Sequence, residues 1–401
     1  MKPFSQRIPR LGTENAFSVI SKANKFETEV LKPQGKKLVR LQIGEPAFDT
    51  PEHVKQAGID AIKANQTHYT AAPGIMDFRK IIAEVTSKKT GVNYVGEDVV
   101  VMSAAKSVMF HMINALIDPG DEVIVPNPGF PIYESVVNYL GGTSVPLPLL
   151  EEKEFNFSLE DLKKLITPKT KMIIINTPQN PTGGVLTKET LEEMAKLCVE
   201  HDLWVLSDEI YDEIVYEGEH ISITKFPGMA ERTVILNGCS KTYAMTGWRL
   251  GWAVTKNAEM AATLEKLVIN DVSCAPAMVQ FAGMAALTGP QDAVAMMKAE
   301  YKKRRDLLVT LNSEVPGFSC KSPKGAFYLF VNVKPILEKL KVNSSEFADM
   351  IMREAHVLVL PGTAFGAHGE GYIRYSYVSS EADINEGMRR IKDYVSSIYT
   401  A

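Results

Sequence analysis

The middle of the chain alternates short apolar runs with stretches of helical pattern, and this alternation constrains the fold more than any other feature. Runs that are apolar throughout and rich in β-branched residues are typical of strands buried on both faces of a sheet. Strand and helix in alternation are typical of a mainly parallel sheet covered by helices. The predicted strands are residues 98–102, 122–126, 143–148, 171–176, 203–207 and 233–237.

Two of the intervening stretches carry clear helical patterns. Residues 106–118 place apolar side chains at helical spacing. Residues 187–202 open on Thr187, a good N-cap, and carry acidic residues in their first half. Both stretches are therefore predicted helices that connect neighbouring strands.

After about residue 290 the pattern changes to long helices and isolated strands. Residues 293–314 and 381–399 have amphipathic helical patterns, and 326–333 and 372–378 are predicted strands. We expect a second, smaller α+β domain, joined by the N-terminal residues because the two ends of a domain often lie close together. The predicted division is 1–45 as the N-terminal segment of the small domain, 46–290 as the large domain and 291–401 as the C-terminal small domain.

Composition and charge argue against several classes of protein. The 401 residues carry 44 basic and 48 acidic side chains that are mixed along the chain, so no nucleic-acid partner is expected. No apolar run approaches the roughly 18 residues of a membrane helix, and no signal core follows the first ten residues. The cysteines have no metal-ligand spacing, so we expect reduced thiols, no metal site and a cytoplasmic protein. They are Cys198, Cys239, Cys274 and Cys320.

Unusual residues follow five of the predicted strands directly. In an open α/β sheet, ligands bind outside the carboxyl ends of the strands. One polar strand end would be ordinary, but five together predict a single large site. The segments are SAAK (103–106), NPGFPIY (127–133), NTPQNPTGG (176–184), SDEIY (207–211) and GCSK (238–241).

Each of these segments also has a structural interpretation. SAAK could expose backbone N–H groups to an anion at a helix N-terminus, or could serve close helix–sheet packing. Asn180 sits in a turn made rigid by prolines, which could be only a loop. Asp208 at a buried strand end needs a cationic or hydrogen-bonding partner, or it could cap a helix over 209–216.

The segment from Cys239 to Trp252 holds a lysine and an arginine with distinct possibilities. Most lysines are solvated, but Lys241 follows a strand at the mouth of the sheet, where desolvation and nearby cations would lower its pKa. Such a lysine forms Schiff bases with carbonyl compounds. Arg249 could pair with a surface acid, but it stands beside Trp248 in an apolar stretch. A buried guanidinium there would need an anion, and phosphate fits its fork.

A lysine for an aldehyde, an anion cup with an arginine for a phosphate, and an aspartate for a ring nitrogen together describe pyridoxal 5′-phosphate. With these residues in place, the chain resembles the class I/II aminotransferases of fold type I nearly end to end. Six segments carry the resemblance, in order and at the family's spacing. They are IGEPAFDTP (43–51), HYTAAPGIMDFRK (68–80), NTPQNPTGG (176–184), SDEIYDEIVYEGEH (207–220), SKTYAMTGWRLGW (240–252) and PGTAFGAHGEGYIRYSY (361–377).

The resemblance implies a fold and a set of residues around the cofactor ring. The fold would be α/β, with a mainly parallel seven-stranded sheet between helices and a smaller α+β domain built from both chain ends. Lys241 would hold the cofactor as a Schiff base and later act as the general base. Asp208 would pair with the ring nitrogen. Asn180 and Tyr211 would bond the phenolic oxygen, and Phe130 would stack on the ring.

The resemblance also implies partners for the phosphate and for the substrate. Arg374 would bind the substrate α-carboxylate, with Asn180 and the backbone near Gly44 beside it. Tyr69 would reach the phosphate of the neighbouring subunit, so a homodimer is implied. The phosphate would otherwise be bound by Ala104, Ala105, Lys106, Ser240 and Arg249, with the backbone N–H groups of Ala105 and Lys106 as donors.

Two positions depart from the family pattern. A phosphate-binding serine is common three residues before the Schiff-base lysine, but this chain has Gly238 there. Alanines 104 and 105 stand where glycine, serine or threonine is common. Neither change removes a charge, so we expect the cofactor to bind with more reliance on Ser240 and Arg249.

The function implied is transfer of an amino group between an α-amino acid and a 2-oxo acid, by a ping-pong mechanism through pyridoxamine phosphate. A carbon–sulfur β-lyase, or another amino-acid enzyme using the same cofactor, stays open as an alternative. A ligand-sensing regulator is a non-enzyme alternative, but such proteins carry a DNA-binding domain ahead of the match. The side chain of the amino acid stays open, since no arginine can be assigned to a distal carboxylate. The segment 13–20 offers only apolar and small polar groups.

Overall fold

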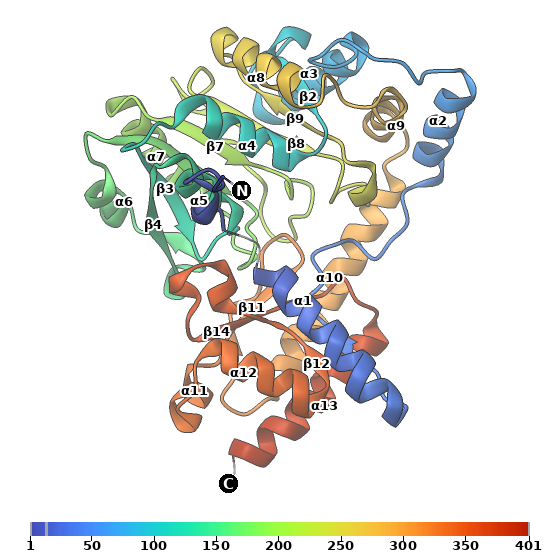
Figure 1. The fold of residues 1–401 in the computed structure, drawn as a ribbon, viewed down its shortest axis with the longest axis vertical. Helices are drawn as coiled ribbons and strands as arrows, with labels where there is room; N and C mark the ends of the chain where they lie inside the picture. The colour runs from blue at the N-terminus through green and yellow to red at the C-terminus, as the bar shows by residue number, and fades with distance from the viewer. Residues whose placement is uncertain (1, 13–14, 400–401) are drawn as a thin grey trace.

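The computed structural model of the chain describes residues 2–12 and 15–399. Two lobes are visible in Figure 1: one is built around a large sheet, and the other is smaller and contains the C-terminal helix. The long helix α10 (Asp292–Ser313) runs from the first lobe into the second. Within the described residues no helix combines the length and apolarity that crossing a membrane requires.

The large sheet is mainly parallel, as predicted. Strands β3, β4, β6, β7 and β8 pair in parallel, whereas β9 is antiparallel to both β2 and β8. The two-residue β5 is added to the edge, antiparallel to β4, so the other seven strands form the expected sheet. The spatial order is β2 (Val99–Met102), β9 (Gly251–Val254), β8 (Thr233–Gly238), β7 (Trp204–Asp208), β6 (Thr170–Asn176), β3 (Glu122–Asn127), β4 (Thr143–Leu150) and β5 (Asn156–Phe157).

Helices cover both faces of this sheet because successive strand residues point to opposite sides. On β7, Leu206 packs in the cluster that contains α4 (Ala105–Leu116), α5 (Ile132–Leu140) and α8 (Ala258–Asp271). Its neighbour Val205 packs on the opposite face. That face is covered by α2 (Glu52–Lys63), α3 (Met76–Thr90), α6 (Leu159–Leu165), α7 (Lys188–Glu200) and α9 (Ala277–Thr288).

The smaller lobe combines both ends of the chain. β1 (Val39–Arg40) pairs in parallel with β12 (Val357–Leu358). A four-stranded antiparallel sheet has the order β10 (Ser319–Cys320), β11 (Tyr328–Asn332), β14 (Tyr372–Ser376) and β13 (Leu360–Pro361). Around these strands lie α1 (Asn15–Phe26), α11 (Lys334–Leu340), α12 (Ser344–Met350) and α13 (Glu381–Tyr399).

The first residues of the described chain lie elsewhere. The short helix at Ile8–Arg10 contacts α5 of the large lobe, where Ser135 Oγ donates a hydrogen bond of 3.0 Å to the carbonyl of Gly12. The N-terminal segment therefore touches both lobes, and Figure 1 shows its start beside α5.

The sequence analysis missed β9 and the two-residue strands β1, β5, β10, β12 and β13, and it suggested one helix that does not form. β9 was not predicted because it is short and begins at a glycine, and because one of its two partners, β2, lies far away in the chain. The alternative in which Asp208 caps a helix over 209–216 is wrong, since turns follow β7. Instead Asp208 Oδ1 accepts the N–H of Ile210 at 3.2 Å within a tight turn.

Candidate active site

A pocket of about 460 Å³ lies at the carboxyl edge of the large sheet, facing the smaller lobe. The segments that follow β2, β3, β6, β7 and β8 all contribute to its wall. The smaller lobe closes it with residues of β11 and β14. The pocket thus brings together the predicted residues Gly44, Ala104, Ala105, Lys106, Phe130, Asn180, Asp208, Tyr211, Ser240, Lys241, Arg249 and Arg374.

Lys241 lies three residues beyond the end of β8, half-buried in the pocket wall. Its Nζ donates a hydrogen bond of 2.6 Å to the carbonyl of Gly44. The same atom lies 5.8 Å from the centroid of the Phe327 ring. The amine therefore stands in a partly desolvated site, in contact with the segment that would cover a bound substrate.

Asp208 is the last residue of β7 and is only 8% exposed. Tyr133, from the first turn of α5, donates a hydrogen bond of 2.5 Å to Asp208 Oδ2. Burial raises the pKa of Asp208 to about 6, although the hydrogen bonds from Tyr133 and Ile210 oppose that shift. Burial and the Asp208 carboxylate raise the pKa of Tyr133, so its hydroxyl stays a donor. Sequence reasoning missed Tyr133; its place in NPGFPIY, after a strand end, was the available signal.

Tyr211 from the large lobe and Tyr328 from the smaller lobe are both buried and contact each other. The hydroxyl of Tyr211 lies 2.9 Å from that of Tyr328 on β11. Burial raises the pKa of Tyr211 well above its usual range, so the phenol is neutral. Its hydroxyl can therefore donate a hydrogen bond toward the pocket while Tyr328 holds its ring in place.

Arg374 lies on β14, 4% exposed, with its guanidinium between two aromatic faces. Its guanidinium carbon is 4.3 Å from the ring centroid of Tyr328 and 4.7 Å from that of Phe365. Nη1 donates to Asn180 Oδ1 at 2.9 Å and Nη2 to the carbonyl of Gln42 at 2.7 Å. A guanidinium fixed in one plane is suited to a carboxylate. Sequence reasoning missed the two rings, which belong to the predicted strand 326–333 and the segment PGTAFGAHG.

The N-terminus of α4 faces the pocket without a capping side chain. Its N-cap is Ala104, at φ 115° and ψ 152°, and its first two residues are Ala105 and Lys106. A Cβ on Gly251 would lie 2.2 Å from the backbone nitrogen of Ala105. The sheet can therefore approach the helix closely only because this position is glycine, and the backbone N–H groups stay available for an anion.

The absence of a serine at Gly238 has a steric reason. A Cβ there would lie 2.7 Å from the carbonyl oxygen of Leu250 and 3.0 Å from Cα of Gly251. Gly238 and Gly251 are paired across β8 and β9. The two glycines let the strands and α4 pack tightly, so the position that could have carried a hydroxyl has no room for a side chain.

Arg249 is not buried, contrary to the expectation from its apolar neighbours. Its backbone is left-handed at φ 57°. That turn places the residue on the exposed rim of the pocket, where Nη1 donates to the carbonyl of Thr246 at 2.8 Å. Ser240, by contrast, is buried in the wall. The Nζ of Lys106 lies 5.2 Å from the centroid of the Phe130 ring, so the two side chains are in contact.

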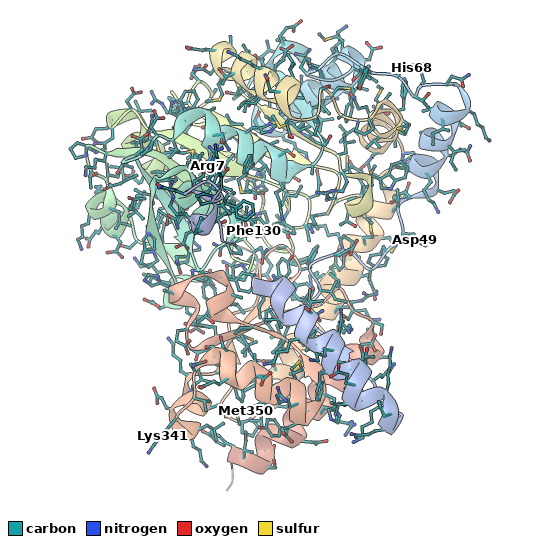
Figure 2. The ribbon with its side chains drawn as sticks, viewed as in Figure 1. Arg7, Asp49, His68, Phe130, Lys341 and Met350 are labelled. Carbon is teal, nitrogen blue, oxygen red and sulfur yellow. The ribbon has the colours of Figure 1, made fainter. Side chains whose placement is uncertain are left out.

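Tyr69 lies outside the pocket of its own chain. It is 88% exposed, in the segment between α2 and α3. Its neighbour His68 lies at the far margin of the large lobe from Phe130 in Figure 2. Of the segment 13–20, residues 13 and 14 lie outside the described residues, and so do the side chains of 15–18; Ile20 lines the pocket.

The residues present fit pyridoxal 5′-phosphate. A buried carboxylate with a raised pKa, such as that of Asp208, is stabilised by a cationic partner, which a protonated ring nitrogen supplies. The uncapped first turn of α4 offers N–H donors to a phosphate. The amine of Lys241 lies in the same pocket. Pyridoxal phosphate would therefore find a partner for its ring nitrogen, for its phosphate and for its aldehyde.

Comparisons with known proteins agree with this geometry. An arginine–pyruvate transaminase of Pseudomonas aeruginosa is 38% identical over 358 residues, which cover 89% of this chain and 90% of that protein. An aromatic-amino-acid aminotransferase of Thermococcus litoralis is 40% identical, covering 88% and 91%. The structure of Thermus thermophilus aspartate aminotransferase with maleate superposes with a TM-score of 0.91 at 36% identity, covering 98% and 100%.

The family model for aminotransferases of class I and II matches residues 36–391. Aminotransferases of this kind use pyridoxal phosphate and act on amino acids and 2-oxo acids. The relatives favour amino-group transfer over the lyase alternative. The predicted fold type is confirmed as well. Sequence, fold and pocket together place the chain in the class I and II family of pyridoxal-phosphate-dependent aminotransferases.

Proposed function

We propose that this pocket performs transamination with Lys241 as the group that moves the proton. The observation that carries the proposal is the convergence of three side chains from distant parts of the chain on one cavity. They supply an amine (Lys241), a buried carboxylate (Asp208) and an oriented guanidinium (Arg374). Such a set matches an aldehyde, a ring nitrogen and a substrate carboxylate at once.

Each residue of the pocket has a task toward the cofactor. When bound, pyridoxal phosphate supplies an electron sink for the bond broken at the substrate Cα. Asp208, oriented by Tyr133, would keep the ring nitrogen protonated. Tyr211 and Asn180 would donate to the phenolic oxygen. Phe130 would pack on the ring, and the phosphate would be bound by the backbone N–H groups of Ala105 and Lys106, by Ser240 and by Arg249. The N–H of Ala104, which the sequence also assigned to the phosphate, donates instead to the carbonyl of Met102 at 2.8 Å.

Toward the substrate, Arg374 would hold the α-carboxylate beside Asn180, with the backbone of Gly44 closing over it. The Nζ of Lys241 would take the proton from the substrate Cα and return it after the amino group has moved. The hydrogen bond from Lys241 Nζ to the carbonyl of Gly44 supports this role. It keeps the amine next to the segment that covers the substrate.

We also propose that the preferred amino acids carry an apolar or aromatic side chain. The wall beyond the ring and carboxylate positions includes Ile20, Ile43 and Phe365. The cationic side chains among the described lining residues are Lys106, Lys241, Arg249 and Arg374. Lys106 lies over Phe130, and the other three have the tasks given above. A side-chain carboxylate would thus have to compete with Phe130 for Lys106 or take a cation from another subunit. A ratio of kcat/KM that favours aspartate over leucine and phenylalanine would contradict this preference.

Homodimerisation and a cytoplasmic location belong to the same proposal. Tyr69 does not line the pocket of its own chain, and its high exposure leaves it available to a second subunit. Mixing Tyr69→Phe protein with Lys241→Ala protein would test this. In a mixed dimer, the Lys241→Ala subunit would supply an intact Tyr69 to the site of the Tyr69→Phe subunit. That site should then retain more cofactor than it does in a dimer of two Tyr69→Phe subunits.

A half-reaction tests the function. The cofactor-loaded protein, mixed with an amino acid and no 2-oxo acid, should release a stoichiometric amount of the matching 2-oxo acid and stop. Its visible absorption should change at the same time and return when a 2-oxo acid is added. Continuous release of pyruvate and ammonia from a cysteine conjugate, without any acceptor, would show a lyase instead.

A further inference from the structure

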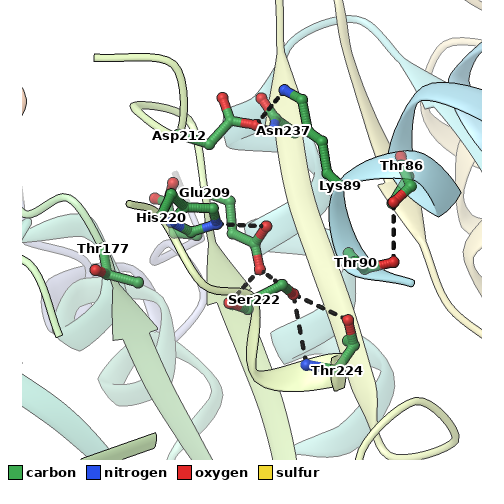
Figure 3. A network of polar contacts seen from close by, with 12 residues as sticks. Thr86, Lys89, Thr90, Thr177, Glu209, Asp212, His220, Ser222, Thr224 and Asn237 are labelled. Carbon is green, nitrogen blue, oxygen red and sulfur yellow. Dashed lines mark hydrogen bonds and ion pairs between the residues drawn. The ribbon is translucent and has the colours of Figure 1, made fainter. Parts of the chain in front are cut away.

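A partly buried ionic network lies beside the turn after β7 and the end of β8 (Figure 3). None of its ionic residues lines the active-site pocket. Four of them instead line a separate cavity of about 30 Å³, which is room for roughly one water molecule. These four are Lys89, Glu209, Asp212 and Glu213, and the amide of Asn237 lines the same cavity.

The network begins where the backbone pairing of β7 and β8 ends. The last backbone hydrogen bond between these segments, in the part of the chain that the structure describes, runs from Glu209 N to the carbonyl of Leu236 at 2.9 Å. Beyond it a side chain takes over, since Asn237 Nδ2 donates to Asp212 Oδ2 at 3.0 Å. Asn237 Oδ1 also accepts the N–H of Gly238 at 2.7 Å. One amide thus connects the turn after β7 to the segment leading to Lys241.

Lys89, near the end of α3, forms an ion pair with Asp212, the residue that accepts the hydrogen bond from Asn237. Its Nζ lies 2.7 Å from Asp212 Oδ2 and also contacts the carboxylate of Glu213. The side chain of Asp212 is only 4% exposed, and burial alone would raise its pKa. The charges of Lys89 and His220 outweigh that effect and lower the pKa of Asp212. Asp212 therefore stays an ionised acceptor for Asn237.

The other end of the same turn is fixed by Glu209. Its carboxylate accepts hydrogen bonds from Ser207 at 2.9 Å and Ser222 at 2.6 Å, and lies 3.0 Å from His220 Nε2. These contacts tie the turn to β7 and to the segment around residue 220. They do not reach β8, which this turn contacts through the backbone hydrogen bond from Glu209 to Leu236 and, further along, through the side chain of Asp212.

We propose that Asp212, Asn237 and Lys89 are positioning residues for transamination. The hydrogen bond between Asn237 and Asp212 sets the place of Asp208 and Tyr211 relative to Lys241. Asp212 lies four residues after Asp208, and Asn237 lies four residues before Lys241. The hydrogen bond therefore joins the segment that carries Asp208 and Tyr211 to the segment that leads to Lys241. The inference rests on the proposed roles of those three residues, because only then does their separation matter to the rate.

Two double variants separate the hydrogen bond from the charges. Lys89→Met with Asp212→Leu removes the ion pair and the acceptor, and leaves no buried charge without a partner. Lys89→Met with Asp212→Asn removes the same charges but keeps an oxygen that Asn237 can reach. We expect the leucine variant to lose about 10- to 100-fold in kcat with KM little changed, as a misplacement near 1 Å would cause. The pH midpoint of the bound cofactor's visible band should move with it, whereas the asparagine variant should resemble the parent.

The matched control lies at the opposite edge of the same sheet. Lys256 pairs with Asp98 at 2.8 Å, and both are largely buried. Lys256→Met with Asp98→Leu should lower the unfolding temperature without moving the visible band. If the leucine variant does not fold, Asn237→Ala removes the donor while leaving Lys89 and Asp212 paired, and the same loss of kcat and the same shift are expected of it.

Two results would overturn the proposal. Leucine and asparagine variants that both match the parent would show that the link does nothing for the site. Equal losses in both would show that charge, and not the hydrogen bond, matters. The half-reaction of the parent protein tests the proposed function separately, so failure of the link would leave that function standing.

Discussion

At the scale of single residues, Asp208 shows how a site can work against the stability of its own fold. The carboxylate is buried, and the hydrogen bonds from a phenol and one backbone N–H, with a smaller contribution from the charge of Lys241, compensate its burial incompletely. Its raised pKa means that the folded, cofactor-free protein resists ionisation there. A protonated ring nitrogen in the pocket would remove that penalty, which links cofactor binding to stability.

This linkage predicts a pH dependence for the cofactor-free protein. The pKa of Asp208 is about 6 in the fold, above the usual value near 3.9 of an unfolded chain. Its contribution to stability is therefore complete below about pH 4 and is lost as the pH rises through about 6, by on the order of 3 kcal/mol. Asp208→Asn has no such group, so its unfolding temperature should fall less between these pH values. Parallel curves for the two cofactor-free proteins would contradict the assignment.

Replacement of Arg374 should weaken substrate binding and leave cofactor binding unchanged. Arg374→Lys keeps the charge but loses the planar fork and the stacking between Tyr328 and Phe365. We expect kcat/KM to fall by about 100-fold, corresponding to roughly 2.7 kcal/mol of transition-state binding. The visible band of the bound cofactor should stay, because Arg374 faces the substrate. Steady-state kinetics beside an absorption spectrum measure both, and an unchanged kcat/KM would remove Arg374 from substrate binding.

At the scale of elements, the junction of β2 and α4 is strained. Ala104 has φ 115° and ψ 152°, a region that glycine occupies with little cost and other residues rarely adopt. The strain turns the first N–H groups of α4 toward the pocket. The glycines of β8 and β9 behind it leave the room that this turn needs.

Ala104→Gly should therefore stabilise the protein. Relief of the strain is worth about 1–3 kcal/mol and exceeds the entropy that glycine adds to the unfolded chain, so we expect a net gain near 1 kcal/mol. Ala105→Gly is the matched control, because Ala105 is the first residue of the helix and has no unfavourable φ. Calorimetry of both variants measures the effect. Destabilisation by Ala104→Gly would show that the strain is absent.

The elements also show what the sequence could and could not predict. Most of the six predicted strands of the sheet form because they are continuous apolar runs, a pattern with few alternatives when helices cover both faces. β4 differs, since it opens on Thr143 and Ser144 and is only partly buried. Thr187 caps α7 as expected, accepting the N–H of Thr190 at 3.2 Å. β9 was not predicted because its pairing with the preceding β8 and with the distant β2 makes it a strand, and the local pattern of its four residues shows neither.

The same limit applies to the site. Residues at strand ends could be found, since topology alone brings Lys241 and Asp208 to one edge. The segment that contains Tyr133 was such a signal too, but the roles of Tyr133 and Tyr328 depend on which hydroxyl lies near which partner, and the sequence does not show that. The exposure of Arg249 follows from one left-handed residue, and local hydrophobicity does not predict that.

At the scale of the whole molecule, the site exists only where the two lobes meet. The large sheet supplies Lys241 and Asp208, and the smaller lobe supplies Arg374 and Tyr328. We propose that the lobes correspond to the two domains expected from the sequence, with boundaries near 45 and 290. In this arrangement a substrate carboxylate bound by Arg374 connects the lobes across the pocket.

The most direct test of the account is the Lys241→Ala variant, measured for turnover and for the visible band of the covalently held cofactor. The account predicts that both are lost, because this side chain is the attachment point and the group that moves the proton. The variant should still fold, with an unfolding temperature close to that of the cofactor-free parent. Full turnover in Lys241→Ala protein would contradict the central claim.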